Sequence, residues 1–204
     1  SEVYKGQDEE GVRLPLHMAA MKGASVDVVR YMVEALPQSL QTADREGNLP
    51  LHYAAMYSGA AVVKLMADLS PEACQHANNR VRLPLHLVCA RVWDQDDSLA
   101  LSMIMNIIRH NPGALRLPDW QGRLPLHLAC EQGRPRHDIV KLLVTSFPAV
   151  LLCEEVESGR TSLAICEWMK SSGLRDNELV LAYLRAKTNQ EKTKKNKSNR
   201  RKLY

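Results

Sequence analysis

The chain has 204 residues, of which 45% are hydrophobic and 25% are charged, as in an ordinary globular domain. Aromatic residues make up only 5%, so we expect a core of Leu, Val, Ile, Met and Ala side chains. The net charge is only +4, and no run approaches the roughly 20 apolar residues of a transmembrane helix, which excludes a helical membrane span.

The N-terminus and the cysteines bear on the cellular compartment. Residues 1–10 are polar and acidic and lack the apolar region of a secretion signal, although a start at Ser1 leaves a removed targeting peptide open. The cysteines are odd in number and lack Cys-x-x-Cys spacing, which disfavours a disulfide framework and a zinc ribbon. We expect buried thiols in a reducing compartment, the cytoplasm or the nucleus. They are Cys74, Cys89, Cys130, Cys153 and Cys166.

One short motif, Leu-Pro-Leu-His, organises the chain. It begins at Leu14, Leu49, Leu83 and Leu124, and a degenerate copy begins at Thr161, so successive copies start 35, 34, 41 and 37 residues apart. Proline favours the first turn of a helix, because the N–H that it lacks would have no partner there. Each copy therefore predicts the start of a short helix.

The segments after each motif keep the same order along the chain. A pair of small residues follows each histidine by one position and lets neighbouring helices pack closely; the pairs begin at Ala19, Ala54, Val88 and Ala129. Apolar residues at helical spacing then predict a second helix. A proline ends it, at Pro37, Pro71, Pro112 and Pro148. Each unit therefore consists of a turn, a short helix, a loop, a second helix and a stop.

This pattern resembles the ankyrin repeat, whose signature contains Thr-Pro-Leu-His-x-Ala at a period of about 33 residues. The resemblance implies an all-α, ankyrin-repeat solenoid of about five helix-turn-helix units in a domain of residues 1–185. The fifth copy lacks Pro and His, as expected of a terminal cap. Val12 and Val81 stand where the turn glycine is expected, which predicts more open turns. The repeats cover about 9–43, 44–77, 78–118, 119–155 and 156–185.

Four of the seven histidines share one motif position, and the resemblance implies a structural role for them. In ankyrin repeats this histidine hydrogen-bonds turn backbone and ties neighbouring units. Equivalent positions in a solenoid lie roughly 10 Å apart, too far for ligands at about 2 Å from one zinc ion. We therefore predict no metal site. The four are His17, His52, His86 and His127, and no role is assigned to His76, His110 and His137.

The resemblance places partner contacts on the turn tips and on the open face of each first helix. Trp120 is the sharpest candidate, because a Trp at a turn tip has little to pack on and Trp and Arg dominate interface hot spots. Packing of Trp120 along the neighbouring turn is the alternative, and Trp168 is expected in or near the core. The candidates are Met21, Lys22, Arg45, Glu46, Asn48, Met56, Tyr57, Arg80, Arg82, Arg91, Trp120, Gln121, Arg123, Glu131 and Gln132.

The third repeat contains an insertion, Trp93–Ser98, between its helices. Its three aspartates lack the glycine turn and the later glutamate of a calcium loop. We expect a solvated loop in which Asp97 or Ser98 caps a helix over 99–109. A partner contact is the alternative, because long loops often carry function.

Residues 186–204 form a basic tail that is predicted to be flexible. The residues from Arg185 to the end include nine Lys or Arg and one Glu and carry a net charge of +8, whereas the other 184 residues carry a net charge of −4. Residues 187–202 include no apolar residue to bury. Three roles stay open for this segment: a solvating tail, a nucleic-acid or nuclear-import patch, and a contact with an acidic protein or membrane. No aromatic residue alternates with the basic ones, which limits any RNA contact to phosphates. The basic residues are Lys192, Lys194, Lys195, Lys197, Arg200, Arg201 and Lys202.

The sequence favours a non-catalytic scaffold or adaptor that binds another protein, as a monomer or as a subunit of a hetero-complex. No nucleotide-binding loop, nucleophile elbow or Cys-His pairing occurs, so we expect neither an enzyme nor a cofactor. One alternative is a subunit of a nucleic-acid-containing assembly that contacts phosphates through the tail. A second is a regulatory module of a longer protein. The motif does not identify the partner, because one fold serves many functions.

Overall fold

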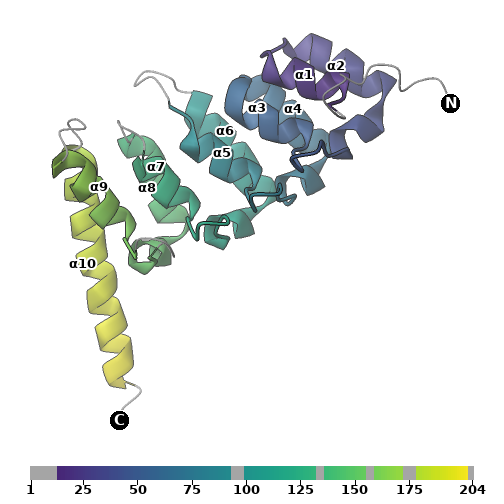
Figure 1. Ribbon diagram of the computed structural model, residues 1–204. Coiled ribbons are helices and arrows are strands. Elements are labelled where there is room, and N and C mark those ends of the chain that lie inside the picture. Colours follow the sequence, from purple (N-terminus) through teal and green to yellow (C-terminus); the bar gives the residue numbers. More distant parts are fainter. Residues whose placement is uncertain (1–12, 93–98, 132–135, 155–158, 172–177, 202–204) are drawn as a thin grey trace. The chain divides into compact units, whose positions relative to one another are not determined.

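The computed structural model describes residues 13–92, 99–131, 136–154, 159–171 and 178–201 (Figure 1). Every regular element in these ranges is an α-helix or a 3₁₀ helix, and the one β feature among them is a bridge between Glu154 and Thr161. The prediction of an all-α fold of helix pairs is confirmed. The chain divides into two compact units, residues 1–88 with 97–114 and residues 89–96 with 115–204.

The first unit contains successive helix pairs. Each pair begins at a motif proline and is followed by a 3₁₀ helix that begins at the proline after the second helix. Helix α1 packs against α3, α2 against α4, and α4 against α6. The elements are α1 (Pro15–Met21), α2 (Val26–Ala35), η1 (Pro37–Gln41), α3 (Pro50–Tyr57), α4 (Ala60–Leu69), η2 (Pro71–Cys74), α5 (Pro84–Ala90), α6 (Leu99–His110) and η3 (Pro112–Arg116).

The second unit continues the same pattern. Helix α7 packs against α9, and α10 packs against η4, α9 and α8. The elements are α7 (Pro125–Glu131), α8 (His137–Ser146), η4 (Pro148–Leu152), α9 (Ser162–Ser171) and α10 (Glu178–Arg201).

The prolines after the second helices do more than stop them. The residues before them, Leu36, Ser70 and Phe147, have a non-helical backbone, with φ of −147°, −141° and −146°. Proline disfavours helical backbone in the residue before it, and its own φ suits the first turn of a new helix. The chain therefore breaks for one residue and then begins the 3₁₀ helix, which the sequence argument did not foresee.

The core consists of aliphatic side chains, as the composition predicts. Its largest fully buried members are Leu, Ile and Met, and Tyr53 is the one Phe, Tyr or Trp among the described residues that is buried. All five cysteines are free, and Cys153 is the one that is only half-buried. None of the described helices combines the length and the hydropathy that crossing a bilayer requires.

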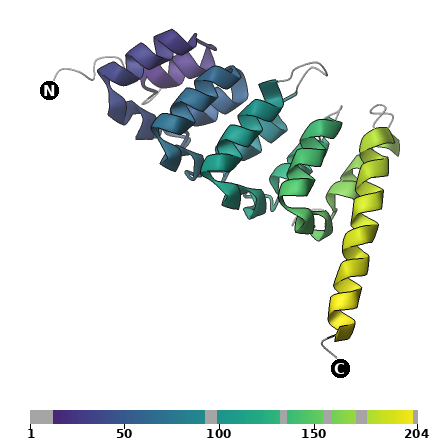
Figure 2. The same ribbon diagram turned by 180° about the vertical axis from the view of Figure 1, so that it is seen from behind.

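Helix α10 contains most of the basic segment that the sequence predicts to be a flexible tail. The helix begins at Glu178 and continues through the basic segment to Arg201. Val180, Leu181, Leu184 and Thr188 are buried, which anchors its first three turns. A helix already nucleated by packed turns adds further residues at little cost, so the polar segment extends it. Both views show α10 continuing past the end of α9 (Figures 1 and 2).

The turn at Val81 corrects the expectation of a more open turn. Val81 has φ of 54°, in the left-handed region, where the corresponding Gly47 and Gly122 have 74° and 77°. The Val81 amide donates to the Asn78 carbonyl at 2.8 Å, as Gly47 does to Asp44 at 3.0 Å. The turn therefore keeps the glycine geometry, and valine bears the strain. Val12 lies outside the described residues.

Candidate partner-binding surface

A polar residue at the start of each turn fixes the backbone of the tip. The Asp44 carboxylate accepts the amides of Glu46 at 2.9 Å and Asn48 at 2.8 Å. The side-chain Oδ1 of Asn78 accepts the amides of Arg80 at 3.0 Å and Arg82 at 2.9 Å.

Asp119 makes the same pair of bonds in the second unit. Its carboxylate accepts the amides of Gln121 at 3.0 Å and Arg123 at 2.9 Å. Asp and Asn favour such turns because their short side chains reach the backbone two residues on. The three tips are therefore rigid platforms for the side chains that they carry.

The motif histidines hold the base of the turns. Leu49 donates its amide to His52 Nδ1 at 3.1 Å, so the proton of the neutral ring lies on Nε2, which contacts the Arg82 carbonyl at 3.1 Å. His17 links Leu14 to the Asn48 carbonyl in the same way. His127 links Leu124 to the Cys153 carbonyl.

For His86 the bond from the Leu83 amide to Nδ1 is present at 3.1 Å. All four imidazoles are fully buried. Histidine is the third residue of each first helix, where a side chain that accepts the amide of the preceding cap residue stabilises the helix start.

Burial disfavours the charged form of these rings. It lowers the pKa of His52 to about 4 and shifts the pKa of His17 and His127 in the same direction. His17, His52 and His127 are therefore neutral structural ties, and both ring nitrogens of each have hydrogen-bond partners.

Two family models match the chain. Residues 3–79 match ankyrin repeats in three copies, and residues 121–152 match a single ankyrin repeat. The chain belongs to the ankyrin repeat family. No curated protein matches it by sequence. Ankyrin repeats are generally protein–protein interaction modules, so the open positions of these repeats are where a partner is to be sought.

Trp120 lies on the tip of an ankyrin turn and is 57% exposed. The backbone beneath it is held by Asp119, whose carboxylate also binds the Arg123 guanidinium at 2.9 Å. Burial opposes ionisation of Asp119, but hydrogen bonds from Arg123 and the turn amides outweigh it and lower the pKa. An exposed indole on a fixed backbone loses little entropy on binding, which suits a hot spot.

Trp168 is the residue that sequence reasoning placed wrongly. It is 49% exposed, not in the core, and the Arg160 guanidinium lies over its ring at 5.0 Å from the centroid. One repeat earlier, Arg123 and Glu131 occupy the same two ankyrin positions and form an ion pair at 3.1 Å. Counting from Leu124 to Thr161 could have placed Trp168 on the open face of its helix.

The remaining candidates divide by exposure. Lys22, Arg45, Glu46, Tyr57 and Arg80 are exposed, whereas Met21, Met56, Arg82, Arg91, Gln121, Arg123 and Glu131 are half-buried. Asn48, in contrast, is buried, and its side chain accepts a hydrogen bond from Asn78 Nδ2 at 2.9 Å. Gln132 lies outside the described residues, as do Trp93–Ser98.

Two further histidines have structural contacts that the sequence did not reveal. His76 Nε2 contacts the Gly47 carbonyl at 3.1 Å, and His110 Nε2 lies 2.9 Å from Asp68. Each joins a residue about one repeat away, which no local pattern indicates.

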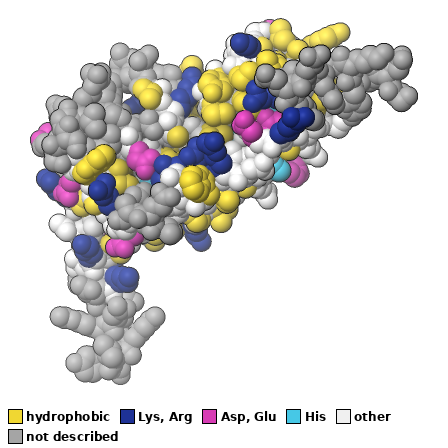
Figure 3. Space-filling view, in the orientation of Figure 1, with side chains coloured by type: hydrophobic (Ala, Val, Ile, Leu, Met, Phe, Trp, Pro, Cys, Tyr) yellow, Lys and Arg dark blue, Asp and Glu magenta, His cyan; other side chains and the backbone are white. Residues whose placement is uncertain are grey.

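In the basic tail, Lys192, Lys194 and Lys195 are exposed on α10, and Figure 3 shows Lys and Arg side chains along this part of the helix. Lys197, Arg200 and Arg201 lie within the helix, and Lys202 lies outside the described residues.

Proposed function

We propose that this chain is a non-catalytic binding module that holds its protein partner through turn tips and the open faces of first helices. The observation that carries the proposal is Trp120, a largely exposed indole on a turn fixed by Asp119. Exposed Trp168, stacked under Arg160 in the same unit, supports it. Trp and Arg are the residues most enriched among binding hot spots.

Affinity purification with three bait proteins tests this proposal. The baits are the wild-type chain, Trp120→Ala and a control, Leu179→Ala, which removes another exposed apolar side chain from the same unit. A protein held by wild type and control should bind Trp120→Ala at least tenfold more weakly, a difference of about 1.4 kcal/mol. Equal capture by all three baits would refute the assignment of Trp120.

The exposed end of α10 favours a second function, binding to the phosphates of a nucleic-acid duplex. After Thr188 the described side chains of α10 are exposed except Glu191, which is half-buried. Residues 189–201 include Lys192, Lys194, Lys195, Lys197, Arg200 and Arg201 and no apolar residue. A membrane-surface helix needs an apolar face, which this segment lacks.

The distribution of these charges favours a groove over a flat acidic surface. At about 100° per residue the six basic positions spread around the helix rather than along one side. The major groove of a duplex admits an α-helix and has phosphates on both flanks. A flat acidic protein surface would use only one side of the helix.

Fluorescence anisotropy with a mixed-sequence DNA duplex tests this second function. If about six phosphates are neutralised, the logarithm of the binding constant should fall against the logarithm of the salt concentration with a slope of roughly −5. Removal of residues 191–204, which keeps the buried anchor of α10, should abolish binding. Retained binding after truncation, or equal competition by poly-glutamate, would exclude a duplex-specific role.

A further inference from the structure

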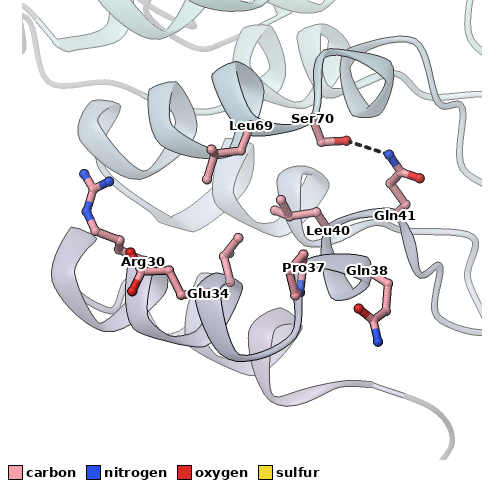
Figure 4. Close-up of a pocket in the computed structure, with 9 residues that line it drawn as sticks. Arg30, Glu34, Pro37, Gln38, Leu40, Gln41, Leu69 and Ser70 are labelled. Atoms are coloured by element: carbon pink, nitrogen blue, oxygen red, sulfur yellow. Dashed lines mark hydrogen bonds between the residues drawn. The ribbon is translucent and has the colours of Figure 1, made fainter.

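A pocket of about 470 Å³ opens between α2, η1 and the end of α4, on second helices rather than turn tips (Figure 4). Its apolar wall includes Val33, Leu40 and Leu69, and Leu69 is 52% exposed. Arg30 and Glu34 line it from α2. Figure 4 shows Leu69 extending from the end of α4 into the gap above α2, with the bond of 3.5 Å from Gln41 Nε2 to Ser70 Oγ on the η1 side.

One repeat later the corresponding acidic residue, Asp68, has several cationic partners. Asp68 binds Lys64 Nζ at 2.7 Å, the Arg109 guanidinium at 2.6 Å and His110 Nε2 at 2.9 Å. Hydrogen bonds from Lys64 and His110 lower the pKa of Asp68 to about 2. Asn111 adds a bond of 3.0 Å to the Cys74 carbonyl. This carboxylate is thus surrounded by partners from two helices.

The repeat register explains why the first space stays open. Glu34, Asp68 and Arg109 each stand three residues before the proline that begins a 3₁₀ helix. Asp68 faces Arg109 and His110 of the next repeat. For Glu34, the residues of the next repeat that correspond to these two are Asp68 and Leu69. An acid and an aliphatic side chain cannot bind a carboxylate, and Ser70 is shorter than Asn111. The described residues accordingly give Glu34 no hydrogen bond and no ion pair.

We propose that this pocket binds a lysine or arginine side chain of a protein partner. The aliphatic stem would pack against Val33, Leu40 and Leu69, and the cationic head would bind Glu34, as Arg109 binds Asp68. Long basic side chains commonly bury their stems in this way. Arg30 does not prevent this, because Lys64 holds the equivalent position and shares Asp68 with Arg109.

Methyl NMR with blocked arginine, N-acetyl-arginine-N-methylamide, tests the pocket directly. Its neutral isostere, the citrulline derivative, is the matched probe. The methyl signals of Val33, Leu40 and Leu69 should shift saturably with millimolar arginine probe, and the citrulline probe should bind roughly fivefold more weakly, as loss of one partly exposed ion pair predicts.

Two variants and a control complete the experiment. Glu34→Gln should weaken binding of the arginine probe by the same factor of roughly five. Leu69→His places an imidazole where the next repeat has His110, and it should abolish binding. Glu72→Gln alters an exposed glutamate on η2 outside the pocket and should change nothing. Equal binding of both probes, wild-type affinity in Glu34→Gln, or no saturable shift in wild type would overturn the proposal. None of these outcomes bears on Trp120, which lies in the other unit.

Discussion

His52 joins the second repeat to the third, because its Nε2 lies 3.1 Å from the carbonyl oxygen of Arg82. The other ring nitrogen accepts the Leu49 amide at 3.1 Å. The bond from the Leu49 amide requires a neutral ring, since protonation of Nδ1 would turn the acceptor into a donor facing another donor. The tie between repeats is therefore also a titratable group.

Stability should fall as the pH drops from 6.5 to about 4. The unfolded chain binds protons at its histidines near pH 6.5, whereas folded His52 resists protonation down to about 4. In this window the unfolded state holds more protons, so its free energy falls relative to the folded state. His52 alone should cost about 2 kcal/mol between pH 7 and pH 5. Urea denaturation at a series of pH values measures this loss.

The carboxylates do not obscure the histidine effect. The pKa values of Asp44, Asp68, Asp119 and Asp138 are lowered in the folded state, so their contributions are lost only as the pH falls below about 3.8. A free energy of unfolding that stays constant from pH 7 to pH 4.5 would contradict the buried neutral state of the histidines.

His52→Ala should destabilise the protein by about 1–2 kcal/mol at pH 7, because it leaves the Leu49 amide and the Arg82 carbonyl without their partner. The difference in the free energy of unfolding between variant and wild type should shrink toward pH 5, because there the buried neutral histidine lowers the stability of the wild type. Urea titrations at both pH values measure the two differences. The same difference at both would mean that His52 contributes packing alone.

Val81→Gly should stabilise the protein by about 1 kcal/mol. Valine at φ of 54° stores strain that glycine lacks, and this gain exceeds the added flexibility of the unfolded chain. Gly47→Ala should have the opposite effect, because a Cβ there would lie 2.6 Å from Asn79 Oδ1 and 2.8 Å from the Asn79 amide nitrogen. Thermal unfolding of both variants measures the two changes in stability. A Val81→Gly variant less stable than wild type would show that Val81 is not strained.

The sequence predicted the features that the repeats share. The motif located the first helices α1, α3, α5 and α7, because proline at the first position and histidine at the third satisfy the helix start locally. Val81 was judged wrongly because local propensity predicts an open turn, whereas the backbone amides of Arg80 and Arg82 both donate to Asn78 Oδ1 and hold the turn closed. Hydrogen bonds within the turn overrode the preference of one residue.

The candidate surface was less predictable than the fold. Trp120 could be placed on a turn tip by counting from the motif, but Asn48 at an equally variable position is buried by Asn78 from the next repeat. The open pocket beside Glu34 depends on which residues the next repeat brings opposite it. Such contacts between repeats follow from pairs of side chains about 30 to 40 positions apart, which a single motif does not encode.

Asp119→Asn should cost less than about 1 kcal/mol, whereas Asp119→Ala should cost about 2 kcal/mol or more. Asn78 shows that an amide side chain can hold the two turn amides, so the asparagine variant loses only the ion pair with Arg123, whose guanidinium keeps Glu131 as a partner. Alanine leaves the amides of Gln121 and Arg123 unpaired in a half-buried turn.

Urea denaturation of both variants at low and high salt separates the two effects. Asp119→Asn should approach wild type as salt screens the ion pair that it lacks, and Asp119→Ala should not. If the turn that carries Trp120 holds the indole in place, Asp119→Ala should also weaken binding of the protein that Trp120→Ala fails to capture. Asp119→Asn should still bind that protein. Equal partner binding by Asp119→Ala and wild type would show that Trp120 acts without the turn that carries it.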